Sequence, residues 1–397
     1  MIRVIQLYLI YTFIILTLLS SSRALSFEYN LYGSIQPEYS LFTNGDGRHN
    51  QSREKPSILG TANFTTFIQD DNAKISISAL GRYDREDNNR SYFDFQKLKY
   101  EYYFDDATIK LGNEIVFWGV NESFHLVDII NQSNLAENLS GTKKLGQPMI
   151  AVSLYREFGD VDFYILPYFR EKIFPGANGR PRLKLEIDEN SISYESSKAE
   201  KHTDFAIRYS TMIDDFDIGF SHFYGNSRNP KLSINQSSLK LDQYYPLLSQ
   251  TGIDIQATKD AWLYKLEAIF AELMSEQYFS AAGGLEYTYY GFNNSSQDLG
   301  LIIEYLFDDR NDQPFNNEGS IGIRWTKNDI NSTTLLAGSI VDLDGNSNQF
   351  FIEYEQRLKN DFKIFVEAVI SGSIDSSDYN YAFKDDSNFK IKIAKYF

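Results

Sequence analysis

The sequence lacks several features that soluble enzymes and binding proteins commonly use. It contains no cysteine among its 397 residues, which excludes disulfide frameworks, thiolate metal sites and a cysteine nucleophile. It contains only four histidines, and none has a second histidine close by in the sequence, so no histidine-based metal site is expected. Lys and Arg number 38 against 54 Asp and Glu, and the formal net charge of −16 argues against nucleic acid as a partner. No glycine-rich phosphate loop is present, and no cofactor is predicted.

Long apolar runs are equally scarce, and the only one lies at the amino terminus. Arg3 precedes an apolar stretch over 4–19, and Ser22-Arg23-Ala24 forms a small-x-small cleavage site. Residues 1–24 are therefore predicted to be a signal peptide, with Ala24-Leu25-Ser26 as a second cleavage site. The alternative is an uncleaved anchor helix, for which the apolar stretch is short. Cleavage removes two arginines and makes the remaining chain, 25–397, still more acidic.

Aromatic residues and alternating hydrophobicity dominate the rest of the chain. Phe and Tyr number 30 and 28 against three Trp, a composition that suits aromatic girdles at two membrane interfaces. From Phe27 onward apolar residues fall at every second position, as in 27–41, which is the period of a β-strand with one apolar face. Similar alternation recurs along the chain in about eighteen segments (16–18), and no helical stripe appears.

The connections between these segments alternate in length. Tight turns are predicted near 70–73, 105–107, 159–160, 213–215, 259–261 and 359–361, with long polar stretches over 43–57, 84–91, 119–148, 171–201, 225–249, 308–319 and 371–386. Transmembrane barrels have short periplasmic turns and long outer loops. Because every backbone group must be paired in hydrocarbon, strands can cross it only as a closed barrel. The predicted fold is therefore all-β, a single antiparallel transmembrane β-barrel with both termini on the periplasmic side.

The last nine residues, FKIKIAKYF, are typical of a strand that closes such a barrel. Phe389, Ile391, Ile393 and Phe397 share one face, and the chain ends on an aromatic residue, whereas Lys395 departs from the apolar pattern of that face. This strand resembles the closing strand of Gram-negative outer-membrane β-barrels, and the stretches 244–270 and 316–369 resemble a porin-like family of poorly characterised outer-membrane proteins. The resemblance implies the bacterial outer membrane, its lipid and the barrel assembly machinery as partners, but no substrate and no functional residues.

The stretch 119–148 is the most distinctive connection. It follows the fifth predicted strand and is too apolar for a simple solvated loop. By position it resembles the loop that folds inward in general porins, so we predict that it enters the lumen. The alternative is an external loop that packs over the mouth or against a neighbouring protomer. The predicted pore constriction has an acidic side of Glu122, His125, Asp128 and Glu137, and a basic side of Arg82, Lys97, Lys99, Arg208, Lys265, Arg324 and Arg357. Opposed charged walls orient polar solutes and set ion selectivity.

Signals of catalysis are weak. His125 and Asp128 could form half of a hydrolase site, but only if that segment is helical, and a polar loop histidine explains the pattern better. The sequence therefore predicts a non-enzymatic, porin-like channel for passive diffusion of small polar or ionic solutes, with a weak cation preference. Two alternatives stay open, a non-channel barrel that serves as a surface scaffold or adhesin, and a barrel hydrolase. The solute and the oligomeric state, monomer or homo-oligomer, are left open.

Overall fold

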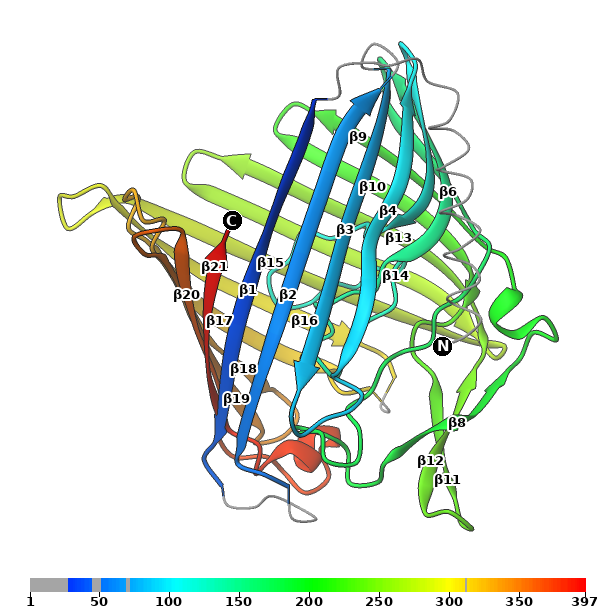
Figure 1. The fold of residues 1–397 in the computed structure, drawn as a ribbon, viewed down its shortest axis with the longest axis vertical. Helices are drawn as coiled ribbons and strands as arrows, with labels where there is room; N and C mark the ends of the chain where they lie inside the picture. Colours follow the sequence, from blue (N-terminus) through cyan, green and yellow to red (C-terminus); the bar gives the residue numbers. More distant parts are fainter. Residues whose placement is uncertain (1–27, 45–50, 69–71, 311–312) are drawn as a thin grey trace.

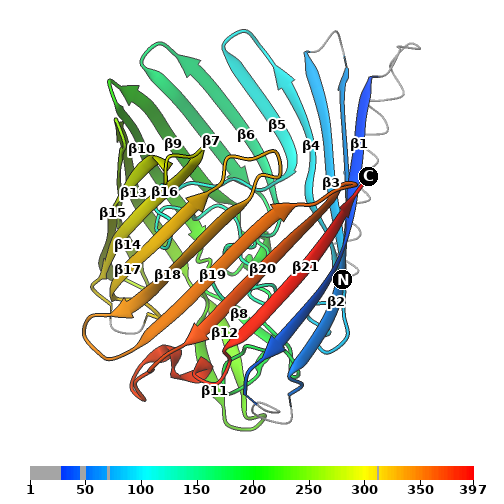
Figure 2. The same cartoon turned by 90° about the vertical axis from the view of Figure 1, so that its left-hand side faces the viewer.

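The computed structural model describes residues 28–44, 51–68, 72–310 and 313–397. The predicted signal peptide, residues 1–24, lies outside the described residues. Within them, eighteen strands form one antiparallel sheet in which each strand pairs with its neighbour in the chain and β1 pairs with β21, so the sheet is a closed barrel (Figures 1 and 2). The predicted fold class and the count of about eighteen strands are confirmed. No described helix is long and apolar enough to span a membrane.

The barrel strands follow the alternating segments of the sequence. They are β1 (Tyr29–Phe42), β2 (Glu54–Ile68), β3 (Ala73–Asp84), β4 (Tyr92–Tyr103), β5 (Ala107–Glu114), β6 (Gln147–Arg156), β7 (Gly159–Leu166), β9 (Asp204–Ile213), β10 (Phe216–Asn226), β13 (Leu247–Lys259), β14 (Trp262–Leu273), β15 (Glu276–Phe292), β16 (Gln297–Asp308), β17 (Asn317–Thr326), β18 (Thr334–Asp342), β19 (Asn348–Arg357), β20 (Phe362–Ser371) and β21 (Asn388–Tyr396).

A second, three-stranded sheet lies in the long connections and was not predicted. It consists of β8 (Ile187–Tyr194), β11 (Lys231–Asn235) and β12 (Lys240–Tyr245), and β12 pairs antiparallel with β11 and parallel with β8. Figure 1 shows it projecting from the loop end of the barrel. Two short 3₁₀ turns, η2 (Ala199–Lys201) and η3 (Tyr379–Phe383), also lie in these connections.

The connections are sorted by length between the two barrel ends, as the sequence indicates. One end has connections of at most seven residues, such as 104–106, 214–215 and 358–361, and we call it the periplasmic end. The other end carries 115–146, 167–203, 227–246 and 372–387. Two connections at this outer end, 274–275 and 343–347, are short. Between β14 and β19 these connections therefore extend little beyond the ends of the strands.

The outward face of the barrel is apolar along its full height. On β16, Leu301, Ile303 and Tyr305 are all exposed, while the residues between them face inward. Exposed aromatic residues gather near both ends, for example Phe104, Phe158 and Trp262 at the periplasmic end and Tyr83, Phe93 and Tyr224 at the outer end. An exposed apolar belt between two aromatic girdles is the surface that a bilayer requires, and it places this barrel in the bacterial outer membrane.

The two ends of the chain meet where the barrel closes. Phe389 and Ile391 lie opposite Leu41 and Tyr39 in the register of β21 and β1, and Phe397 exchanges two backbone hydrogen bonds with Gly33, of 2.9 and 3.1 Å. Lys395, which departs from the apolar pattern, lies beside the 358–361 turn, where its Nζ donates to the Asn360 carbonyl at 2.7 Å. A lysine at the end of a lipid-facing strand can extend its ammonium group into water, so this residue is compatible with the lipid face.

Candidate pore constriction

The connection 115–146 between β5 and β6 lies inside the barrel and is called the inner loop here. Figures 1 and 2 show it crossing the interior. Its side chains Val127 and Ile130 are fully buried and pack in one cluster with inward-facing residues of β6, β7, β9, β10, β13 and β14. This inner face is apolar, which is unusual for a water-filled barrel, and the loop removes its apolar area from water. Gly252 on β13 permits the close approach, because a Cβ there would lie 2.9 Å from Val127 Cγ1.

A single carboxylate on the barrel wall holds the backbone of the inner loop. Glu267 on β14 is completely buried. Its Oε1 accepts the N–H groups of Val120 and Asn121 at 2.8 and 3.0 Å, and its Oε2 accepts those of Leu126 and Val127 at 2.7 and 3.2 Å. Hydrogen bonds from backbone N–H groups to a carboxylate are charge-assisted and stronger than those between neutral groups. Glu267 therefore fixes two separate turns of the loop at one point.

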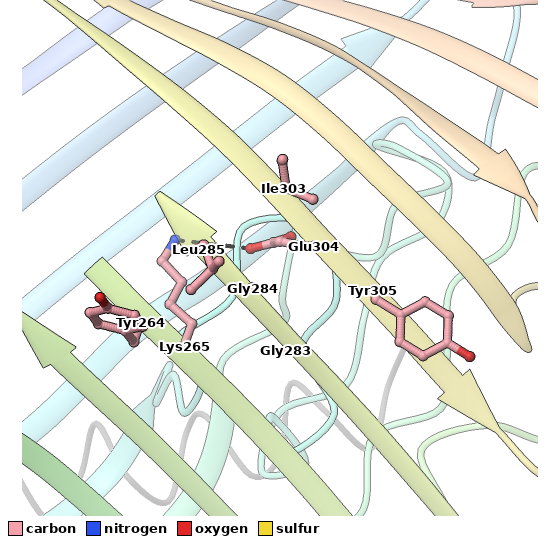
Figure 3. Close-up of a pocket in the computed structure, with 8 residues that line it drawn as sticks. All are labelled: Tyr264, Lys265, Gly283, Gly284, Leu285, Ile303, Glu304 and Tyr305. Carbon is pink, nitrogen blue, oxygen red and sulfur yellow. Dashed lines mark ion pairs between the residues drawn. The ribbon is translucent and has the colours of Figure 1, made fainter. Parts of the chain in front are cut away.

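A second carboxylate, on the next strand but one, holds the adjoining residues. Glu304 on β16 accepts the N–H groups of Glu122 and Ser123 at 2.6 and 2.7 Å. Lys265 lies between this carboxylate and Glu286, at 3.9 and 3.7 Å respectively. Figure 3 shows the Lys265–Glu304 pair beside the glycine pair of β15. Because the loop supplies N–H groups and the wall supplies carboxylates, the inner loop is docked through charge-assisted hydrogen bonds.

The opposite part of the inner loop is anchored near the first strands. Glu137 lies 2.7 Å from Arg82 Nε on β3 and 3.5 Å from Arg90, and it accepts a hydrogen bond from the Tyr92 hydroxyl at 3.0 Å. Glu38 on β1 also pairs with both arginines, at 3.4 Å from Arg82 and 2.5 Å from Arg90. The inner loop thus spans the lumen from the β14–β16 wall to the β1–β3 wall.

One part of the inner wall stays open to solvent beside the loop. In the register of the sheet, inward-facing residues of neighbouring strands form a cross-strand row, here called the wall row, which consists of Arg324, Leu336, Glu353, Glu367 and Lys390. Glu367 pairs with Lys390 at 3.1 Å and with Lys392. Glu353 is exposed, whereas the inward-facing Glu267 and Glu304 on β14 and β16 are buried under the loop.

The four residues predicted for the acidic side have different surroundings. Glu122 pairs with Arg324 at 2.5 Å, and Glu137 pairs with Arg82 as described. Asp128 is buried and pairs with Lys144 of the same loop at 3.0 Å. His125 stacks edge-on against Phe117, with ring centroids 5.1 Å apart, and its buried Nδ1 has no hydrogen-bond partner among the described residues.

The residues predicted for the basic side are mostly paired with carboxylates of the wall itself. Arg208 forms a bidentate pair with Asp254 at 2.7 and 2.8 Å, and Lys99 pairs with Glu114 and Glu101 at 2.5 and 3.0 Å. Lys97 is exposed on the inner face opposite Ser78, and Arg357 is exposed near the periplasmic end of β19. Arg82 and Arg324 therefore meet acids of the inner loop, whereas Arg208, Lys99 and Lys265 meet acids of the barrel.

Sequence reasoning missed the acidic residues of the wall. They are Glu38, Asp254, Glu267, Glu286, Glu304, Glu353 and Glu367, which hold the loop, neutralise inward-facing cations or face the open lumen. The signal for them was present, because each lies on the polar face of its strand, and the cations were chosen by the polar faces of theirs. Selecting Asp and Glu on the polar faces of the predicted strands, as was done for Lys and Arg, would have found them.

A second connection narrows the outer mouth. Residues 167–203 leave β7 and reach the far wall, where Arg180 Nε lies 2.6 Å from an Asp386 carboxylate oxygen and its guanidinium donates to backbone carbonyls at Asn44 and Asp385. On the way, Gly176 donates to Asp87 at 3.1 Å. Burial raises the pKa of Asp87. We call residues 171–186 the mouth segment.

The histidines do not form a catalytic or metal-binding group within the described residues. His202 contacts Asp204 at 2.9 Å, but the other Asp204 oxygen is held by Arg228 at 2.8 Å. His222 lies 3.0 Å from the Thr251 hydroxyl, and His49 lies outside the described residues. The described part of the chain contains no group of three His, Asp or Glu side chains placed to hold a metal ion.

Comparison with known proteins finds likeness only among solved structures. No protein-family model and no curated protein matches the chain. A loop-deletion variant of OmpT, an outer membrane protein of Vibrio cholerae, aligns with a TM-score of 0.47 at 11% identity, covering 94% of this chain and all of that one. An engineered variant of the Rh. blastica porin aligns with a TM-score of 0.46 at 12% identity, covering 93% and all, respectively. The closed eighteen-stranded barrel with its exposed apolar belt shows that this chain is an outer-membrane β-barrel.

Proposed function

We propose that this barrel is a passive channel for small polar solutes. The observation that carries the proposal is the unequal exposure of the inner wall. The inner loop buries the inward-facing residues of β13–β16, whereas Glu353, Glu367, Lys390 and Lys392 on β19–β21 keep solvent contact. Barrels of sixteen to eighteen strands are wide enough for an aqueous channel. A row of solvent-exposed charged residues beside the docked loop would line a path for polar solutes along one side of the lumen.

The proposed channel prefers cations weakly. The net charge of −16 raises the local concentration of cations near both mouths. Most inward-facing cations are neutralised by wall carboxylates, so they oppose cation entry less than their number suggests. Because ion pairs of both signs line the lumen, the preference over anions is modest.

A second candidate function is a non-channel barrel that acts as a surface scaffold or adhesin. The observation that favours it is the amount of structure at the outer end, where the mouth segment crosses towards β21 and the sheet of β8, β11 and β12 projects beyond the rim. In this case the inner loop and the mouth segment together close the lumen. A hydrolase has less support, since His125 and Asp128 have separate partners, and we propose that the chain is not an enzyme.

Single-channel recording in planar bilayers tests these alternatives. The channel hypothesis predicts a steady conductance for the purified, heat-modifiable barrel. The scaffold hypothesis predicts no conductance although the barrel is folded. A variant that lacks residues 121–141 removes the part of the inner loop held by Glu267, Glu304 and Arg82. It should conduct more than the wild type if the loop narrows the path. Equal conductance of the two proteins would contradict a constriction, and esterase or peptidase turnover by the wild type would favour a hydrolase.

A further inference from the structure

The barrel wall is hollowed at β15, where two glycines follow each other (Figure 3). The hollow has a volume of about 380 Å³ and lies between Tyr264 on β14 and Tyr305 on β16. Gly283 lies opposite Leu266 and Tyr305 in the register of the three strands. A position between two large side chains therefore carries no side chain of its own, and we call the hollow that results the β15 groove.

The β15 groove opens towards lipid and not towards the lumen. Its outward-facing residues Tyr264, Leu285 and Ile303 are exposed on the apolar belt. Lys265 and Glu304 flank the same glycines from the inner side, and both are buried. The surface that stays open is therefore uncharged. A groove in hydrocarbon that is left unfilled forfeits the van der Waals contacts of its walls, so we expect an apolar group to occupy it.

The end of the groove at Tyr264 lies in the periplasmic aromatic girdle. The rings of Trp262 and Tyr264 are stacked, with their centroids 6.3 Å apart. Lys259 lies opposite Trp262 in the register of β13 and β14 and is exposed, and a lysine at this depth can extend its ammonium group to a lipid phosphate. At the outer end of this sector the exposed side chains Glu272 and Asp309 are acidic, and they repel an anionic headgroup. The groove therefore fits a lipid whose headgroup lies on the periplasmic side.

We propose that the β15 groove holds one acyl chain of a phospholipid of the periplasmic leaflet, with the lipid phosphate beside Lys259. The hydrophobic effect does not drive this binding, because the surrounding lipid is as apolar as the groove. The preference comes from dispersion contacts. A chain in the groove contacts Tyr264, Leu285 and the Gly283 backbone together, whereas a chain on a flat part of the belt has protein on one side only. Several extra carbon contacts correspond to a preference of about two- to fivefold.

Photo-crosslinking in proteoliposomes tests this position. The vesicles consist of phosphatidylethanolamine and phosphatidylglycerol, with a trace of phosphatidylglycerol that carries a diazirine in the middle of one acyl chain. Mass spectrometry of the digested barrel then gives the extent of labelling at each residue. Tyr264, Leu285 and Ile303 should be labelled about two- to fivefold more than comparably exposed lipid-facing residues of β7 and β9, such as Phe163 and Phe205.

Two variants change the groove and the headgroup contact separately. Gly283→Leu fills the groove and should reduce the labelling of its lining to the level of β7 and β9. A Cβ at this position would lie 3.3 Å from the Lys265 carbonyl oxygen, so heat modifiability on gels must confirm the fold. Lys259→Gln should lower the labelling by about half, the effect of losing one exposed charge contact. The matched controls are Ala337→Leu on the lipid face of β18 and Lys395→Gln at the end of β21, and both should leave the labelling of the groove unchanged.

Three results would overturn the proposal or a part of it. Labelling that is even over comparably exposed residues, or equal in Gly283→Leu and the wild type, would show that lipid chains do not prefer the groove. Unchanged labelling in Lys259→Gln would contradict the position of the phosphate. Weak labelling of the groove, together with the mass of two or more barrels in native mass spectrometry, would assign the groove to a second copy of the chain and overturn the lipid.

Discussion

Glu122 of the inner loop and Arg324 of β17 form an ion pair, with 2.5 Å between Oε2 and Nη2, although 202 residues separate them in the chain. Arg324 also contacts Glu286 on β15 through its Nε at 3.2 Å. One guanidinium therefore joins the loop to two strands of the wall. Both partners are partly exposed, so the pair lies at the border of the open lumen.

Removing this guanidinium should make the channel more cation-selective. In Arg324→Gln, Glu122 and Glu286 lose their shared cation, and their negative charges then face the lumen. The reversal potential across a KCl gradient should move towards the potassium equilibrium potential. Arg156→Gln is the control, because Arg156 pairs with Asp106 at a periplasmic turn at 2.8 Å. A reversal potential that moves towards chloride in Arg324→Gln would contradict this charge balance.

Removing the Glu267 carboxylate should loosen the inner loop without unfolding the barrel. In Glu267→Ala, four backbone N–H groups lose their acceptor, and each buried N–H left unpaired costs about 1–3 kcal/mol. The expected result is a higher and more variable single-channel conductance, with the heat modifiability of the barrel largely kept. Glu272→Ala, at an exposed position of the same strand, should behave like the wild type. Identical conductance traces for both variants would show that Glu267 does not hold the loop.

Adding a side chain at Gly33 should weaken barrel closure. A Cβ at this position would lie 2.5 Å from the Thr61 carbonyl oxygen and 3.0 Å from the Phe397 ring. Gly33→Val should therefore displace the last residue of β21 and reduce the fraction of heat-modifiable, folded barrel recovered from membranes. Gly60→Val is the matched control on the neighbouring strand, where the nearest atom lies 3.9 Å away. Equal recovery of folded barrel for both variants would contradict the prediction.

Removing the Arg180 side chain should release the mouth segment. The side chain is fully buried, and it joins this segment to Asp386 beside β21. In Arg180→Ala the Asp386 carboxylate, whose side chain is 13% exposed, loses a charged partner, and breaking a largely buried pair is destabilising. Proteases added outside intact cells should then cut within 171–186 faster than in the wild type, with the barrel core still resistant. Arg182→Ala, which removes hydrogen bonds to nearby carbonyls such as that of Ala177, should change the rate less.

The barrel was predictable because its signal is repeated many times. Alternation along each strand follows directly from the two environments of its faces, lipid and lumen, and a misread segment changes the count only by one. The sheet of β8, β11 and β12 was not predictable in the same way. Its strands are short, as in Lys231–Asn235. β11 and β12 form a hairpin within one connection, but β8 joins β12 in parallel from a different connection.

The position of the inner loop was predicted from its apolar residues, but its docking was not. The docking depends on which wall residues lie opposite, and this is set by the register of strands that are far apart in sequence. One local signal was available. At Ile269 and Ala271, β14 is apolar on its inner face as well as on its outer face. An apolar inner face indicates that another part of the chain covers it inside the barrel.

The four amide groups held by Glu267 also determine when the inner loop acquires its shape. Their acceptor follows them in the chain by about 140 residues or more, and the Glu304 acceptor by about 180. The segment between β5 and β6 therefore cannot adopt its final conformation until β14 and β16 face it. Docking of the inner loop depends on the second half of the wall having formed.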